Sequence, residues 1–165
     1  MMKGLRTILL CLMVAGYGLP AGCRPVAHRI PVSVIYSGVH CGAGQQAFQA
    51  AWVGHPERVA QHRAVPQSIG PIRWDPEKEG VLWLEMGVKP TGGYALELDD
   101  PEATVSGGVA VVSVRWRAPA PDMFVTQALT SPCLVLKLPK ADLEAIHIQD
   151  QDGALRAKVQ VPGDG

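Results

Sequence analysis

Thiol and hydroxyl side chains are the candidate nucleophiles in this 165-residue chain. Cys41 directly follows His40, and a thiol beside a base is the pairing that nucleophilic catalysis uses. Adjacent residues of an extended chain point to opposite faces, however, so the imidazole is badly placed to take the thiol proton. No Gly-x-Ser-x-Gly motif occurs, and the serines fall in strand or turn contexts. We therefore expect no catalytic residues and a protein that is not an enzyme.

Metal ligation and phosphate binding are the other chemistries that the residue types suggest. The histidines are scattered, and the nearest cluster (His55, Glu57 and His62) lies in an irregular segment without His-Glu-x-x-His spacing. A phosphate cradle needs a helix after its glycines, whereas Gly92 and Gly93 run into a predicted strand. We expect neither a metal site nor a small-molecule cofactor.

The most informative segment is residues 87–94, which lies between two predicted strands and reads Gly-Val-Lys-Pro-Thr-Gly-Gly-Tyr. Pro fixes φ at about −65° and Gly tolerates positive φ, so the loop has a defined shape. A shaped loop on a β-scaffold favours recognition of a partner. The alternative is that the glycines serve only a tight turn and that the tyrosine begins the next strand. The candidate partner-binding residues are Lys89, Pro90, Thr91, Gly92, Gly93 and Tyr94.

The N-terminus has the order of a secretory signal, with Lys3 and Arg6 before an apolar run at residues 7–15 and small residues before Cys23. We expect residues 1–22 to be a signal peptide and residues 23–31 to be a membrane tether. Residues 19–23, Leu-Pro-Ala-Gly-Cys, resemble a bacterial lipoprotein signal, which implies acylation of Cys23 by a fatty acid such as palmitate. Arg24, in place of an acidic residue, resembles lipoproteins of the outer membrane that face the periplasm. The alternative is an ordinary signal, which leaves a periplasmic protein with a spare thiol at Cys23.

Charge and cysteine content narrow the partners further. Two of the 15 basic groups leave with the signal, so 13 basic groups remain against 15 acidic ones. A net charge of about −2 without a basic cluster argues against nucleic acid as a partner. With Cys11 removed and Cys23 acylated, Cys41 and Cys133 remain as an even pair in an oxidising compartment. We predict a disulfide between them, and two buried free thiols are the alternative.

The rest of the chain is long enough for one domain with its own core, which we expect over residues 32–162. Apolar runs and alternation predict strands at residues 32–36, 81–88, 94–99, 109–117, 133–138, 145–149 and 155–161. Residues 89–93 would then be a hairpin loop. Residues 44–53 hold good helix formers, with Phe48 and Trp52 on one stripe, and predict a helix packed on a sheet.

These elements predict a mainly β (α+β) fold in which an antiparallel sheet forms a sandwich or a partly open barrel, with one packed helix near residues 44–53. Alternate residues of the strands are expected to build one dry core. Its predicted members are Leu82, Leu84, Leu96, Leu98, Val112, Val114, Leu134, Leu136, Ile146 and Ile148.

Two stretches together resemble the C-terminal domain of the PrcB family. They are residues 87–96, with their Pro-Thr-Gly-Gly-Tyr loop, and residues 129–139, which read Leu-Thr-Ser-Pro-Cys-Leu-Val-Leu-Lys-Leu-Pro. The resemblance covers roughly residues 80–140, and the family is named after a small lipoprotein subunit of a bacterial surface protease complex. It implies a protein-binding or accessory subunit, with an exported protease as the candidate partner. Cys133 stands where the family usually has an aromatic residue, which supports a crosslink to Cys41.

The same loop is similar to the Pro-Thr-Thr-Gly-Tyr loop that chagasin-type inhibitors present to cysteine proteases. Their companion Arg-Pro-aromatic loop is missing, since residues 115–119 read Arg-Trp-Arg-Ala-Pro. The alternative function is therefore inhibition of a cysteine protease by the loop at residues 90–94.

Overall fold

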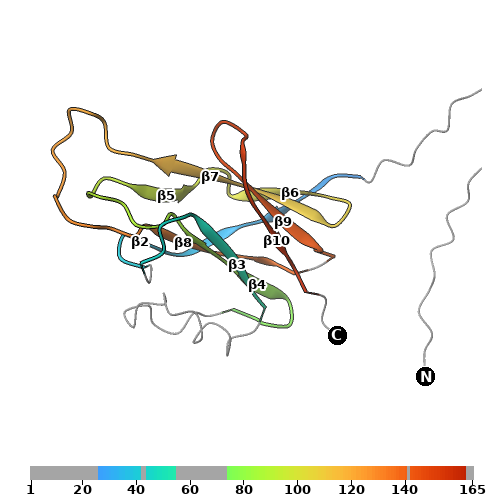
Figure 1. The fold of residues 1–165 in the computed structure, drawn as a ribbon. Coiled ribbons are helices and arrows are strands. Elements are labelled where there is room, and N and C mark those ends of the chain that lie inside the picture. The colour runs from blue at the N-terminus through green and yellow to red at the C-terminus, as the bar shows by residue number, and fades with distance from the viewer. Residues whose placement is uncertain (1–25, 42–43, 55–73, 141, 163–165) are drawn as a thin grey trace, which may run out of the picture.

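Strand pairing divides the chain between two β-sheets that pack face to face (Figure 1). The computed structural model describes residues 26–41, 44–54, 74–140 and 142–162. Within these ranges the strands are β1 (His28–Pro31), β2 (Ser33–Gly38), β3 (Gln49–Val53), β4 (Glu79–Glu85), β5 (Ala95–Leu98), β6 (Glu102–Ser106), β7 (Val109–Arg117), β8 (Cys133–Pro139), β9 (Ala145–Gln149) and β10 (Leu155–Gln160).

The larger sheet has the order β1-β6-β7-β9-β10, with β5 paired to β7 as well. β5 and β6 run antiparallel to successive parts of β7, whereas β9 runs parallel to it. The two strands predicted at the C-terminal end are β9 and β10, and they pair antiparallel. The long strand β7 therefore pairs with β5 and β6 along one edge and with β9 along the other.

The smaller sheet has the order β2-β8-β4-β3, and all its pairs are antiparallel. Its central strand β4 is buried along nearly its whole length, as the continuous apolar run at residues 81–88 predicts. One face contributes to the main core, and the other carries a second buried cluster. That cluster consists of Cys41, Val53, Val81, Trp83, Cys133 and Val135.

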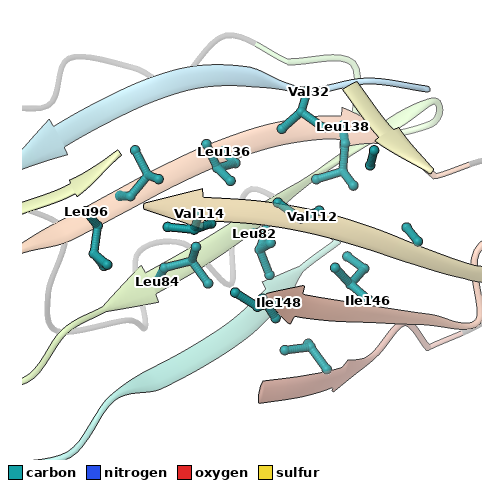
Figure 2. Packing of buried hydrophobic residues seen from close by; sticks show 14 of the residues in the cluster. Val32, Leu82, Leu84, Leu96, Val112, Val114, Leu136, Leu138, Ile146 and Ile148 are labelled. Carbon is teal, nitrogen blue, oxygen red and sulfur yellow. The ribbon is translucent and has the colours of Figure 1, made fainter. Parts of the chain in front are cut away.

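The main core lies between the sheets, where the labelled side chains of β4 and β8 face those of β7 and β9 (Figure 2). Nine of the ten predicted core residues are at most 1% exposed, and the tenth, Leu98, is partly buried against the same cluster. Burial of one leucine or isoleucine side chain contributes about 1.5–3 kcal/mol. The two-sheet arrangement answers the open question of sandwich or barrel in favour of a sandwich.

The helix predicted at residues 44–53 is wrong. Gln49–Val53 forms β3 and pairs with β4, and no helix occurs in residues 26–41, 44–54, 74–140 or 142–162. The aromatic residues that suggested a helical stripe pack on the sandwich instead. Phe48 contacts Trp116 edge-on at 5.1 Å, and the Trp52 ring lies so close over Gly80 that a Cβ there would be 2.1 Å from it. Sheet pairing and aromatic packing outweigh helix propensity here.

The hairpin predicted between residues 81–88 and 94–99 is also wrong, because β4 lies in the smaller sheet and β5 in the larger one. The loop at residues 89–93 therefore crosses between sheets. The expected tether at residues 23–31 overlaps β1, which pairs with β6, so the first strand of the described residues begins at His28, before the expected start of the domain at residue 32. Among the described residues, no helix has the length and apolar character needed to cross a membrane.

Candidate functional site

Residues 87–94, here called the motif loop, connect β4 of one sheet to β5 of the other. Two of its glycines have positive φ, with 80° at Gly87 and 86° at Gly93. A Cβ at Gly87 would also lie 2.5 Å from the carbonyl oxygen of Gln46. The backbone of this loop therefore requires glycine at these positions, as predicted, and the requirement arises where the chain crosses from one sheet to the other.

Residues 118–130, here called the tip loop, connect β7 to β8 and lie beside the motif loop. Lys89 and Thr130 exchange two backbone hydrogen bonds, at 2.8 and 3.0 Å. The Gly92 amide donates to the Thr126 carbonyl at 2.9 Å, and the Thr130 hydroxyl donates to the Thr91 carbonyl at 2.8 Å. Together the motif loop and the tip loop form one unit, the paired loops, which extends beyond one end of the sandwich (Figure 1).

The predicted binding residues divide into exposed and engaged groups. Pro90 and Gly93 are exposed, whereas Lys89, Thr91, Gly92 and Tyr94 are half-buried. Tyr94 packs against the main core, and the Lys89 ammonium lies 5.9 Å from the centre of its ring. The motif loop therefore positions its neighbour as well as presenting its own surface.

The tip loop is the part of this site that the sequence reasoning missed. Gly93 is in contact with it, since a Cβ there would lie 2.8 Å from Pro119 and 3.0 Å from Val125. Three large apolar residues of this loop face solvent: Phe124 is fully exposed, Leu129 is 71% exposed and Met123 is 52% exposed. The available signal was an apolar run, Met-Phe-Val, in a proline-rich connection between two strands.

A disulfide fixes the base of the paired loops. The predicted pair, Cys41 and Cys133, is bonded in the structure, with a Cα–Cα distance of 5.8 Å. Beside it, the Cys41 amide donates to the Ser131 carbonyl at 3.0 Å, and the Met86 amide donates to the Pro132 carbonyl at 2.8 Å. Because Cys41 is bonded to Cys133, it is no free thiol for His40 to activate.

Carboxylate and imidazole side chains are among the remaining groups of the described residues that could bear chemistry. Glu85 is buried on the outer face of the smaller sheet and accepts a hydrogen bond of 2.8 Å from the Trp83 indole. Among the residues that the structure describes, no three His, Cys, Asp or Glu side chains are placed to hold a metal ion. Cys23 and the cluster of His55, Glu57 and His62 lie outside the described residues.

Comparison with known proteins bears on the same region. A family model described as PrcB C-terminal matches residues 81–139. No curated protein and no solved structure gives a significant match to the chain. The matched segment runs from β4 to the end of β8 and contains both members of the paired loops. The resemblance predicted from the sequence is confirmed over residues 81–139, which match the PrcB C-terminal family model.

Proposed function

We propose that this chain is a non-catalytic, protein-binding accessory subunit of the cell envelope, with an exported protease as its partner. The family match carries the proposal, because it covers the segment that builds the paired loops. The family takes its name from a subunit of a protease complex, and a fold alone would not indicate such a role. The site combines a loop of defined shape with exposed apolar side chains beside it. Both features are typical of protein-binding surfaces.

The exposed side of the motif loop is the proposed contact surface. Pro90 and Gly93 offer a rigid, solvent-facing backbone, and the Lys89 ammonium beside the Tyr94 ring supplies a charge. Thr91 and Gly92 contribute differently, since their backbone groups hold the tip loop. Substitution of Lys89 therefore tests contact, whereas substitution of Thr91 or Gly92 tests loop position.

Recovery of partners from envelope extract tests this proposal. The domain without its signal peptide would be used as wild type and as Lys89→Glu, with Lys158→Glu as a matched control, because Lys158 is an exposed lysine on β10. We expect the wild type and the control to recover the same protein, and Lys89→Glu to recover several-fold less of it. Equal recovery by all three variants would remove the motif loop as the contact, and no specific recovery by the wild type would refute the accessory role.

The membrane anchor rests on acylation of Cys23, which we propose from the sequence at residues 19–23. Palmitate labelling in a bacterial host tests it, because a Cys23→Ser variant has no thiol to acylate. We expect labelling of the wild type and none of the variant. Equal labelling of both would refute the anchor and leave a periplasmic protein.

Inhibition of a cysteine protease is the second candidate function. One observation favours it: the structure brings Pro119, from the segment compared with the missing companion loop, against Gly93 of the motif loop. Two adjacent loops at one end of a sandwich are a shape that a protease cleft accepts. Papain activity measured with micromolar domain tests the idea, and full residual activity would remove this candidate.

A further inference from the structure

The tip loop presents an apolar surface that neither the motif nor the core requires. Met123, Phe124 and Leu129, here called the apolar tip, lie within seven residues of one another and point into solvent. Single exposed apolar residues are normal on a protein surface, but three large ones on one projecting loop mark an interaction site. Phe124 is the extreme case, because its side chain contacts almost nothing in this chain.

The backbone beneath the apolar tip is held in place. The Met123 amide donates to the Ala120 carbonyl at 3.0 Å, and the Thr126 carbonyl accepts from the Gly92 amide. Pro119 packs on Gly93, and Pro121 restricts the chain just before the apolar residues. A surface already fixed in its bound shape loses less entropy on association, so this loop is suited to tight contact.

Charge and position indicate what covers the apolar tip. Residues 118–130 contain one charged residue, the exposed Asp122, and no basic residue, so an anionic lipid surface is a poor match. The tip also lies far from the N-terminal end of the domain. His28 of β1 pairs beside Val105, near the start of β7, whereas the tip loop follows the far end of β7 (Figure 1).

The length of chain before β1 strengthens this orientation. Five peptide units separate Cys23 from His28, and they reach at most about 18 Å. An acylated Cys23 therefore keeps the β1 end of the sandwich close to the membrane. The apolar tip then points away from that membrane, toward proteins in the adjoining compartment.

We propose that the apolar tip docks into an apolar pocket of a partner protein, and that a basic residue at the rim of this pocket pairs with Asp122. This inference rests on the proposed function: it adds the apolar tip to the contact surface proposed for the motif loop, and it specifies the partner's chemistry. Phe124 is the anchor residue, with Met123 and Leu129 as its flanks. The motif loop supports this surface from below through Gly92 and Thr91.

Titration calorimetry with a purified partner tests the inference. The probe is the protein that the wild-type domain recovers from envelope extract, identified by mass spectrometry and then purified. The variants are Phe124→Ser and Asp122→Lys, with Val26→Ser as the control, because Val26 is 88% exposed and lies at the β1 end. We expect Phe124→Ser to raise Kd by at least about tenfold, as loss of an interface anchor does. Asp122→Lys should raise Kd less, by an amount that shrinks with added salt, and Val26→Ser should leave Kd within about twofold.

The outcomes separate this inference from the proposed function. An unchanged Kd for Phe124→Ser, with a partner still bound, overturns the apolar tip and leaves the accessory role standing. Failure of the wild type to recover any protein overturns both. Flotation of the domain with phosphatidylcholine vesicles that depends on Phe124 would make lipid the occupant. Phe124-dependent dimerisation in sedimentation would make a second copy the occupant, and either result overturns the inference. Phe124→Ser should fold normally, because the side chain it removes is fully exposed.

Discussion

The paired loops and the turn between β9 and β10 are both held by hydrogen bonds, but different groups make these bonds. In the turn, one buried carboxylate makes three of the contacts. Asp150 accepts from the backbone amides of Asp152 (3.0 Å) and Ala154 (2.8 Å) and pairs with Arg156 (2.6 Å). In the paired loops, groups far apart in sequence bond to each other: the backbones of Lys89 and Thr130 pair, and the Thr130 hydroxyl donates to the Thr91 carbonyl across 39 positions. The turn is a local structure, whereas the paired loops exist only when both sheets have formed.

The two regions also differ in what they leave exposed. The Asp150 carboxylate of the turn finds its partners within seven residues. Two further groups of the turn contact β7, since Gln151 accepts from the Trp116 amide at 2.9 Å and Arg156 lies over the Trp116 ring at 5.5 Å. The paired loops bond to each other through backbone groups but leave Phe124, Met123 and Leu129 in solvent. A turn whose polar groups bond within the chain needs no partner protein. The paired loops expose large apolar side chains on a fixed base, which is a feature of a protein-binding surface.

Removal of the disulfide should cause the largest loss of stability, and it removes the crosslink at the base of the paired loops while leaving the β9–β10 turn unchanged. Cys41 and Cys133 are separated by 92 positions, so the Cys41→Ala/Cys133→Ala variant frees a long loop in the unfolded chain. The chain-entropy model gives a loss of about 4–5 kcal/mol in the free energy of unfolding. Urea unfolding measures the loss, and dithiothreitol treatment of the wild type should reproduce it. An unchanged midpoint would show that the crosslink does not support the fold.

Two glycine substitutions, one in each region, sharpen the comparison. Gly93 and Gly153 both have positive φ, at 86° and 77°. A Cβ at Gly153 meets nothing within 4 Å, whereas one at Gly93 would clash with Pro119 at 2.8 Å. Gly153→Ala should therefore lose about 1 kcal/mol from backbone strain alone. Gly93→Ala should lose about 2–3 kcal/mol, because it adds steric overlap with the tip loop.

Urea unfolding of both variants measures this difference. Hydrogen exchange adds a local reading, since the Gly92 amide that bonds to Thr126 should exchange faster in Gly93→Ala, beyond the change expected from lost global stability. Equal losses in the two variants would mean that the tip loop moves aside without penalty. The paired loops would then be no more fixed than the isolated turn.

Most strands of the sandwich were predictable from the sequence, because alternation of apolar and polar residues and continuous apolar runs indicate directly which side chains are buried. β7 spans the predicted residues 109–117, and the predicted core residues are buried. The turn after β9 was predictable for the same reason that it is stable, since its contacts are local. Asp150 and Gly153 are close in sequence to the groups to which they bond, since the Ala154 amide donates to the Asp150 carboxylate and the Gly153 amide to the Asp150 carbonyl.

The sheet to which each strand belongs was not predictable in this way. Nothing in residues 81–99 distinguishes a hairpin from a crossing between sheets, because both need a shaped loop between two apolar strands. The helix error has a related cause: Trp52 packs over Gly80, which is distant in sequence. The tip loop was missed because its role depends on contacts with Gly92 and Thr91 that only the completed fold provides.

The smallest effect concerns the charge of Asp150 and tests the turn alone. Burial raises the pKa of this carboxyl, but the hydrogen bonds from the Ala154 amide, Arg156 and the Asp152 amide outweigh it, so the pKa lies below its ordinary value of 3.8. The folded state therefore holds the proton more weakly than the unfolded chain. Its contribution to stability is complete above the ordinary pKa and disappears as the pH falls through the lower pKa of the folded state.

The Asp150→Asn variant isolates this contribution, because the amide keeps one oxygen acceptor and loses the charge that pairs with Arg156. We expect a modest loss of stability at pH 7 and a shallower decline of stability below about pH 4 than in the wild type. Thermal unfolding between pH 2 and pH 7 measures both slopes, and Asp152→Asn, which changes an exposed carboxylate of the same turn, is the control. Binding to a partner should be unaffected, since Asp150 bonds with residues of its own turn and of the start of β10. A loss of binding in Asp150→Asn would join the two regions into one functional surface and end the contrast between them.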